Sequence, residues 1–209
     1  MHSGNGIDHK DDQSVTEVAE EEMLRAYTYA TLASLLRRAP DNATLADLTK
    51  LGANDSEMGQ ALVALADAAR ECTVEAVKEE YQNLFIGVGE AELTPYTSYY
   101  LTGFTYEKPL AKLRIEMSSL GIVRDDNVPE PEDHIAALCE MMSGLITGAF
   151  GEPLDLTRQQ TFFDTHIASW AERFFEDLET APSAVFYKPV GTIGKLFMRI
   201  EIQSFALAA

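Results

Sequence analysis

Apolar residues recur at three- and four-residue spacing along most of the chain, which places them on one face of an α-helix. The first such stretch begins at Val18. It stops at Ala39-Pro40-Asp41, because proline lacks an amide proton and disfavours helix at the residue before it. The same reasoning predicts further helices over 44–51, from Ser56 to about 69, from Thr73 to about 86, over 109–120, from Pro131 to about 145, over 156–179 as one helix or a broken pair, and over 183–206.

No alternating run of apolar and polar residues is long enough to predict a strand. We therefore predict an all-α protein, with a single-domain helical bundle over residues 17–209. Residues 1–16 are rich in Gly, Asp and Ser and lack apolar periodicity, so they are predicted to form a disordered acidic tail. The segment 90–105 breaks the helical period with Pro95, Gly103 and several aromatics, and is predicted to be an ordered loop.

The charge of the chain narrows the choice of partners. Thirty-four acidic and 16 basic residues give a net charge of −18. Nucleic acids and anionic membrane surfaces require clustered Lys and Arg, so both are poor partners. No stretch approaches the roughly 20 apolar residues of a membrane span, and residues 1–22 have no apolar core typical of a secretory signal. We expect a cytoplasmic protein without stable membrane insertion, and a basic peptide suits its charge.

Catalytic motifs are not found in the sequence. It has no phosphate-binding loop, no HExxH, no GxSxG and no CxxC, so neither a cofactor nor a bound metal is expected. The most distinctive cluster of polar residues is Glu130-Pro131-Glu132-Asp133-His134, and several interpretations of its role stay open. The carboxylates can cap a helix start. A helical metal-dependent hydrolase could use the Glu130–His134 cluster with His166, although Pro131 disfavours a continuous helix between two ligands.

Recognition of a basic and apolar peptide is a further interpretation. Arginine pairs bidentately with carboxylates and stacks on aromatic rings. An apolar stretch of the peptide would need a groove. The aromatic loop with Tyr96, Tyr99 and Tyr100 could line one, and the acidic cluster would face the arginine.

Four segments also resemble one known family, in order and spacing, from about residue 20 to 205. Residues 130–134 match the E-P-x-D-H signature of the TorD/DmsD/NarJ group of redox-enzyme maturation chaperones. Residues 81–87 resemble that family's aromatic-x-x-Leu-Phe-x-Gly segment, and 95–99 resemble its Pro-aromatic-x-Ser loop. Phe163, His166, Trp170 and Phe174 resemble its later F-x-x-H-x-x-x-W-x-x-x-F helix.

This resemblance implies an all-helical chaperone without enzymatic turnover. Its partners would be the twin-arginine signal peptide and the catalytic subunit of a molybdoenzyme, of the DMSO/TMAO reductase, nitrate reductase or formate dehydrogenase type. The chaperone would hold that subunit for cofactor insertion before export. By position, the peptide-binding residues would be Tyr81, Leu84, Phe85, Pro95, Tyr96, Ser98, Glu130, Pro131, Glu132, Asp133 and His134. The resemblance to family members that dimerise also suggests a homodimer. A structural subunit of a redox complex is the remaining alternative to the chaperone role.

Overall fold

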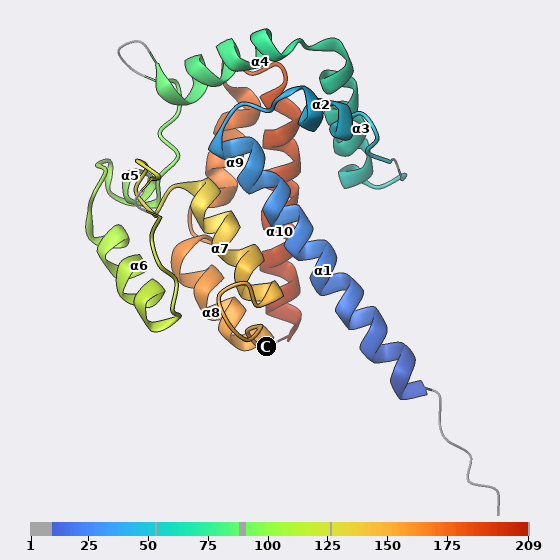
Figure 1. Ribbon diagram of the computed structural model, residues 1–209, viewed down its shortest axis with the longest axis vertical. Helices are drawn as coiled ribbons and strands as arrows, with labels where there is room; N and C mark the ends of the chain where they lie inside the picture. Colours follow the sequence, from blue (N-terminus) through green and yellow to red (C-terminus); the bar gives the residue numbers. More distant parts are fainter. Residues whose placement is uncertain (1–9, 53, 88–90, 126, 209) are drawn as a thin grey trace, which may run out of the picture.

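The computed structural model describes residues 10–52, 54–87, 91–125 and 127–208. Within these ranges the chain forms helices and no β-strand, which confirms the all-α fold (Figure 1). The elements are α1 Lys10–Arg37, α2 Asn42–Leu48, α3 Glu57–Glu71, α4 Val74–Tyr81, a π-helical turn η1 Gln82–Ile86, α5 Thr97–Thr102, α6 Lys108–Ser119, α7 Ile135–Thr147, α8 Leu156–His166, α9 Ala171–Thr180 and α10 Tyr187–Ala208.

The core lies between the long helices. α1 packs along α7, and α10 packs along α9 and against α3 (Figure 1). The largest fully buried side chains are aromatic and come mainly from α8, α9 and the start of α10, with Tyr29 from α1. None of the helices in the described ranges is long and apolar enough to cross a bilayer.

Helix starts follow the capping residues that the sequence offers. The Ser56 side chain accepts a hydrogen bond from the Gly59 amide at the start of α3, as predicted. The Thr73 side chain accepts one from the Ala76 amide at the start of α4. The tail expected over 1–16 falls largely outside the described residues, and α1 begins at Lys10 within the remainder.

Several boundary predictions were wrong, and three of them concern the elements discussed below. Residues 97–102 form α5 within the predicted loop. α7 begins at Ile135, not at Pro131, because His134 is its N-cap. α10 begins at Tyr187 and continues through Pro189 and the glycines beyond it, because a proline in the first turn removes an amide that has no intrahelical partner.

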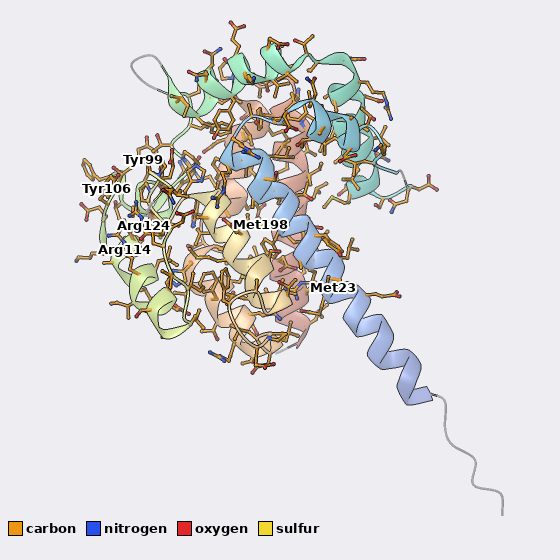
Figure 2. The ribbon with its side chains drawn as sticks, in the orientation of Figure 1. Met23, Tyr99, Tyr106, Arg114, Arg124 and Met198 are labelled. Carbon is orange, nitrogen blue, oxygen red and sulfur yellow. The ribbon has the colours of Figure 1, made fainter. Side chains whose placement is uncertain are left out.

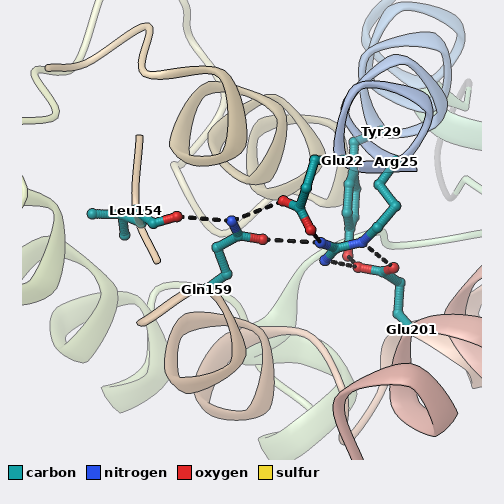
Figure 3. A network of polar contacts seen from close by, with 6 residues as sticks. All are labelled: Glu22, Arg25, Tyr29, Leu154, Gln159 and Glu201. Carbon is teal, nitrogen blue, oxygen red and sulfur yellow. Dashed lines mark hydrogen bonds and ion pairs between the residues drawn. The ribbon is translucent and has the colours of Figure 1, made fainter. Parts of the chain in front are cut away.

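A polar network joins the first and last long helices (Figure 3). Glu201 of α10 is buried, and it accepts two hydrogen bonds of 2.8 Å from the Arg25 guanidinium of α1 and one of 2.9 Å from the Tyr29 hydroxyl. Arg25 also donates to Glu22 and to Gln159 of α8. Through these bonds Arg25 joins α1 to both α8 and α10.

Candidate functional site

Two of the segments matched by sequence pair with each other. The Thr97 amide donates to the Asp133 carbonyl at 3.0 Å, and the Ile135 amide donates to the Pro95 carbonyl at 2.9 Å. Tyr96 and His134 thereby form an isolated antiparallel bridge, with their rings edge to face at 5.1 Å. The Pro-aromatic-x-Ser loop and the E-P-x-D-H motif, far apart in the sequence, are therefore one structural unit.

Asp133 holds this unit together from inside. Its side chain is 1% exposed, and Oδ2 accepts both the Ser98 amide at 2.8 Å and the Ser98 hydroxyl at 2.6 Å. Ser98 lies in the first turn of α5, whose N-cap residue Tyr96 makes no side-chain capping bond. Asp133 thus caps α5 from a distant segment. Its Oδ1 is buried without a hydrogen-bond partner in the described part of the chain.

His134 faces the same region as a neutral ring. Its Nδ1 accepts the Ala136 amide at 3.1 Å, so the neutral imidazole carries its proton on Nε2. Burial, and secondarily the positive charge of Arg37, lowers the pKa of His134 to about 4. At neutral pH the side chain is therefore an uncharged donor next to α7.

The two glutamates of the motif have different environments. The Glu132 side chain is 9% exposed, and its carboxylate accepts hydrogen bonds from Nε and Nη2 of Arg114 at 2.8–3.1 Å. Arg124 forms a longer ion pair with it at 3.7 Å. Figure 2 labels both arginines on the same side of the molecule. No hydrogen bond or ion pair to Glu130 is found in the described ranges. Burial and, secondarily, the Glu130 charge raise the pKa of both Tyr81 and Tyr96 to about 12, and Glu130 lines the same groove as Tyr81.

Beside the motif lies a groove of about 210 Å³, called here the motif groove. Its apolar wall comes from α6, α7 and the loops that follow them, and its polar rim comes from the motif and the end of α1. The lining residues used below are Arg37, Tyr81, Met117, Ile122, Val128, Glu130, Glu132, His134, Glu140, Met141 and Phe150.

The predicted site residues fall into two groups. Tyr81, Glu130, Pro131, Glu132 and His134 line the motif groove. The others support it from behind or alongside. Leu84, Pro95, Ser98 and Asp133 are buried, Phe85 packs between Tyr81 and Tyr187, and half-buried Tyr96 lies against His134.

Asp133 was expected to face a peptide arginine. In this conformation its carboxylate faces Ser98 instead, and contact with a ligand stays a prediction. Among the described residues no group of three or more His, Cys, Asp or Glu side chains is arranged to hold a metal ion. The arrangement can accept positive charge at Glu130 and apolar atoms along the groove wall.

Sequence reasoning missed several groove residues. Arg37 at the end of α1 forms an ion pair with Glu140 of α7, and Phe150 follows α7 in the chain. Glu140 is the one charged residue of the apolar helix α7, and that contrast could have drawn attention to it. Nothing in the sequence pairs Arg37 with that helix.

The helical fold is that of a known protein family. The family model described as nitrate reductase delta subunit matches residues 51–176, more than half of the chain. The chain therefore belongs to the nitrate reductase delta subunit family, which confirms the resemblance to the TorD/DmsD group.

Named relatives agree with this family. The chain is 25% identical over 172 residues to the chaperone protein TorD of Vibrio atlanticus, covering 76% of this chain and 80% of the relative. It is 30% identical over 119 residues to the probable Tat proofreading chaperone DmsD of Haemophilus influenzae, 56% of each chain. A crystal structure from Archaeoglobus fulgidus, assigned as a redox enzyme maturation protein, has a TM-score of 0.57 at 23% identity, covering 84% of this chain and 93% of that one, and shows the same fold.

Proposed function

We propose that this protein is a non-enzymatic chaperone that binds the twin-arginine signal peptide of a molybdoenzyme subunit. It holds that subunit in the cytoplasm until the cofactor has been inserted, before export. The relatives named as TorD and DmsD chaperones support the chaperone role. The observation that carries the peptide assignment is the motif groove, in which an apolar wall adjoins the carboxylate of Glu130.

Each part of the groove suits one part of such a peptide. Glu130 and Tyr81 line the same groove, so a guanidinium can pair with the carboxylate and contact an aromatic ring. Glu132 is already satisfied by Arg114, and breaking that bidentate pair would leave a largely buried charge uncompensated. Asp133 and Ser98 act by fixing α5 and the loop. The chain's charge of −18 attracts a basic peptide over distance.

Titration calorimetry with a synthetic peptide tests the proposal. The peptide carries two adjacent arginines followed by apolar residues, and a second peptide has both arginines replaced by glutamine. Glu130→Gln removes one carboxylate–guanidinium contact at a half-exposed position, for which about 0.5–1.5 kcal/mol corresponds to about two- to tenfold weaker binding. Glu176→Gln, an exposed position on α9 outside the groove, makes the same change of charge and is the matched control.

The outcomes separate the parts of the proposal. Weaker binding by Glu130→Gln alone, with a smaller preference of that variant for the arginine peptide than the wild type shows, supports the site. Equal affinities of both variants and the wild type remove Glu130 from it. No binding of the arginine peptide by the wild type at low salt overturns the function. Affinity capture from a lysate of the source organism, with mass spectrometry, then identifies the client.

A further inference from the structure

A second hollow continues the motif groove along the bundle. It has a volume of about 340 Å³ and runs between α1 and α7, which lie side by side in Figure 1. Its walls carry small side chains, and we call it the α1–α7 channel. The lining includes Ala30, Ala33 and Ser34 of α1 and Ser143, Gly144 and Thr147 of α7.

The two hollows share three lining residues, Arg37, Glu140 and Phe150. Arg37 reaches from the end of α1 to Glu140 on α7 and forms an ion pair with it. The Arg37 charge also lowers the pKa of His134 and of Asp125, so its guanidinium lies within electrostatic reach of both sides of the motif groove. The ion pair therefore lies where the two hollows meet.

Phe150 completes this boundary. A Cβ added to Gly144 would lie 2.2 Å from the Phe150 ring, so the ring rests directly on the α7 backbone. Gly148 has a φ of 78°, a conformation that other residues rarely adopt, and it turns the chain so that Phe150 returns onto α7. Among the described residues the Phe150 ring packs against no aromatic side chain, and Phe150 is 37% exposed.

The Arg37–Glu140 ion pair is easy to exchange. Their side chains are 39% and 56% exposed, and exposed ion pairs contribute little to stability because solvent screens them. A guanidinium from a ligand can replace that of Arg37 on Glu140 with nearly the same interaction. The paired Glu132, whose side chain is 9% exposed, offers no such exchange.

We propose that the Arg37–Glu140 ion pair divides one continuous peptide site, and that a basic and apolar peptide opens it. The peptide's arginine takes the place of Arg37 on Glu140, and its apolar residues enter the α1–α7 channel. This inference rests on the proposed function and deepens it, because it extends the apolar part of the peptide from the motif-groove wall into the channel and names an internal competitor of its arginine.

The charge and shape of the region select this occupant. Glu130 lines the motif groove and Glu140 lies where the two hollows meet, so the motif-groove half of the combined site offers two arginine acceptors. The small side chains of the channel leave room for larger apolar ones, and the Thr147 hydroxyl is already bonded to the Ser143 carbonyl at 2.8 Å. A basic peptide of uniformly polar character would fill the groove and leave the channel empty.

Opposite effects from the two partners of one ion pair test the exchange. Arg37→Gln removes the competitor and tightens binding of the arginine–apolar peptide by about two- to fivefold, the range that an exposed ion pair allows. Glu140→Gln removes the acceptor and leaves Arg37 unpaired, so binding weakens about threefold or more. Arg199→Gln is the matched control, because Arg199 forms an ion pair of similar exposure with Glu172 between α10 and α9.

A second pair of variants tests the channel. Ser34→Trp fills it from an exposed position on α1, and Gln60→Trp places the same side chain on an exposed position of α3. Two peptides are compared, one with arginines and apolar residues and one that ends after the arginines. Ser34→Trp is expected to bind the long peptide no more tightly than the short one, while Gln60→Trp keeps the difference seen for the wild type.

The results distinguish failure of this inference from failure of the function. If the wild type binds the long peptide but Arg37→Gln and Glu140→Gln shift affinity in the same direction, the exchange is refuted. If Ser34→Trp binds both peptides as the wild type does, the apolar residues lie elsewhere and the channel is refuted. If the wild type binds neither peptide, the proposed function fails and this inference fails with it. Thermal unfolding of each variant confirms that it is folded.

Discussion

The neutral state of His134 makes the stability of this protein depend on mildly acidic pH. The ring is 7% exposed, and its pKa is lowered from 6.5 to about 4 by burial and by Arg37. Between these two pKa values the imidazole of His134 is therefore protonated in the unfolded chain and neutral in the folded chain. The stabilisation is fully present above about pH 6.5 and is lost progressively as pH falls toward 4.

The size of this effect follows from the two pKa values. A shift of one pKa unit corresponds to about 1.4 kcal/mol, and most of the shift of His134 is realised between pH 7 and pH 5. Protonation linkage at this residue then lowers the free energy of unfolding by about 2 kcal/mol over that interval. His134→Asn removes the titrating ring, and an asparagine oxygen can still accept the Ala136 amide at the start of α7.

Urea unfolding followed by far-ultraviolet circular dichroism measures the difference. The free energy of unfolding is determined at pH 7 and pH 5 for the wild type and for His134→Asn. His166, whose pKa is also lowered chiefly by burial, is present in both proteins and cancels in the comparison. The wild type is expected to lose about 2 kcal/mol more than the variant. Equal losses in the two proteins refute the argument that His134 is held neutral by its surroundings.

Three further predictions concern the packing around the site. Glu201→Gln removes the buried carboxylate that pairs with Arg25 and leaves Glu22 as the remaining charged partner, and urea unfolding should show a loss of about 3–5 kcal/mol; a loss below 1 kcal/mol contradicts the buried-pair account. Gly191→Ala places a Cβ 2.5 Å from a backbone nitrogen of α9, so the melting temperature should fall, by an amount equivalent to about 1–3 kcal/mol; an unchanged melting temperature shows that the helices separate freely. Ser98→Ala removes the hydroxyl bonded to Asp133 and should lower the free energy of unfolding by about 1.5–3 kcal/mol, whereas Ser98→Thr, which retains a hydroxyl, should lose less; equal losses contradict this role of the hydroxyl.

The sequence was sufficient where structure is local. Ser56 caps α3 as predicted, because a serine cap and the helix it starts are adjacent in the chain. The long helices were found from their apolar spacing. α5 was missed because six residues are too few to display a helical period, and because its cap comes from Asp133 in another segment.

The site shows the same division between local and distant information. The motif 130–134 indicated the right region, and five of the predicted residues line the motif groove. Which carboxylate is exposed could not be predicted. Burial of Asp133 and pairing of Glu132 depend on Ser98 and Arg114, which approach only after the chain has folded. Arg37 and Glu140 were missed for the same reason.

The network between α1 and α10 has a consequence for synthesis of the chain. Arg25 and Glu201 are separated by 176 positions, so Arg25 emerges from the ribosome long before its main partner exists. At about 5–20 residues per second, that interval lasts roughly 9–35 s. During this time Arg25 has Glu22 of its own helix as a charged partner but lacks Glu201. The network thus stays incomplete until α10 has been synthesised, and a product truncated before α10 lacks the buried carboxylate that Arg25 and Tyr29 bind.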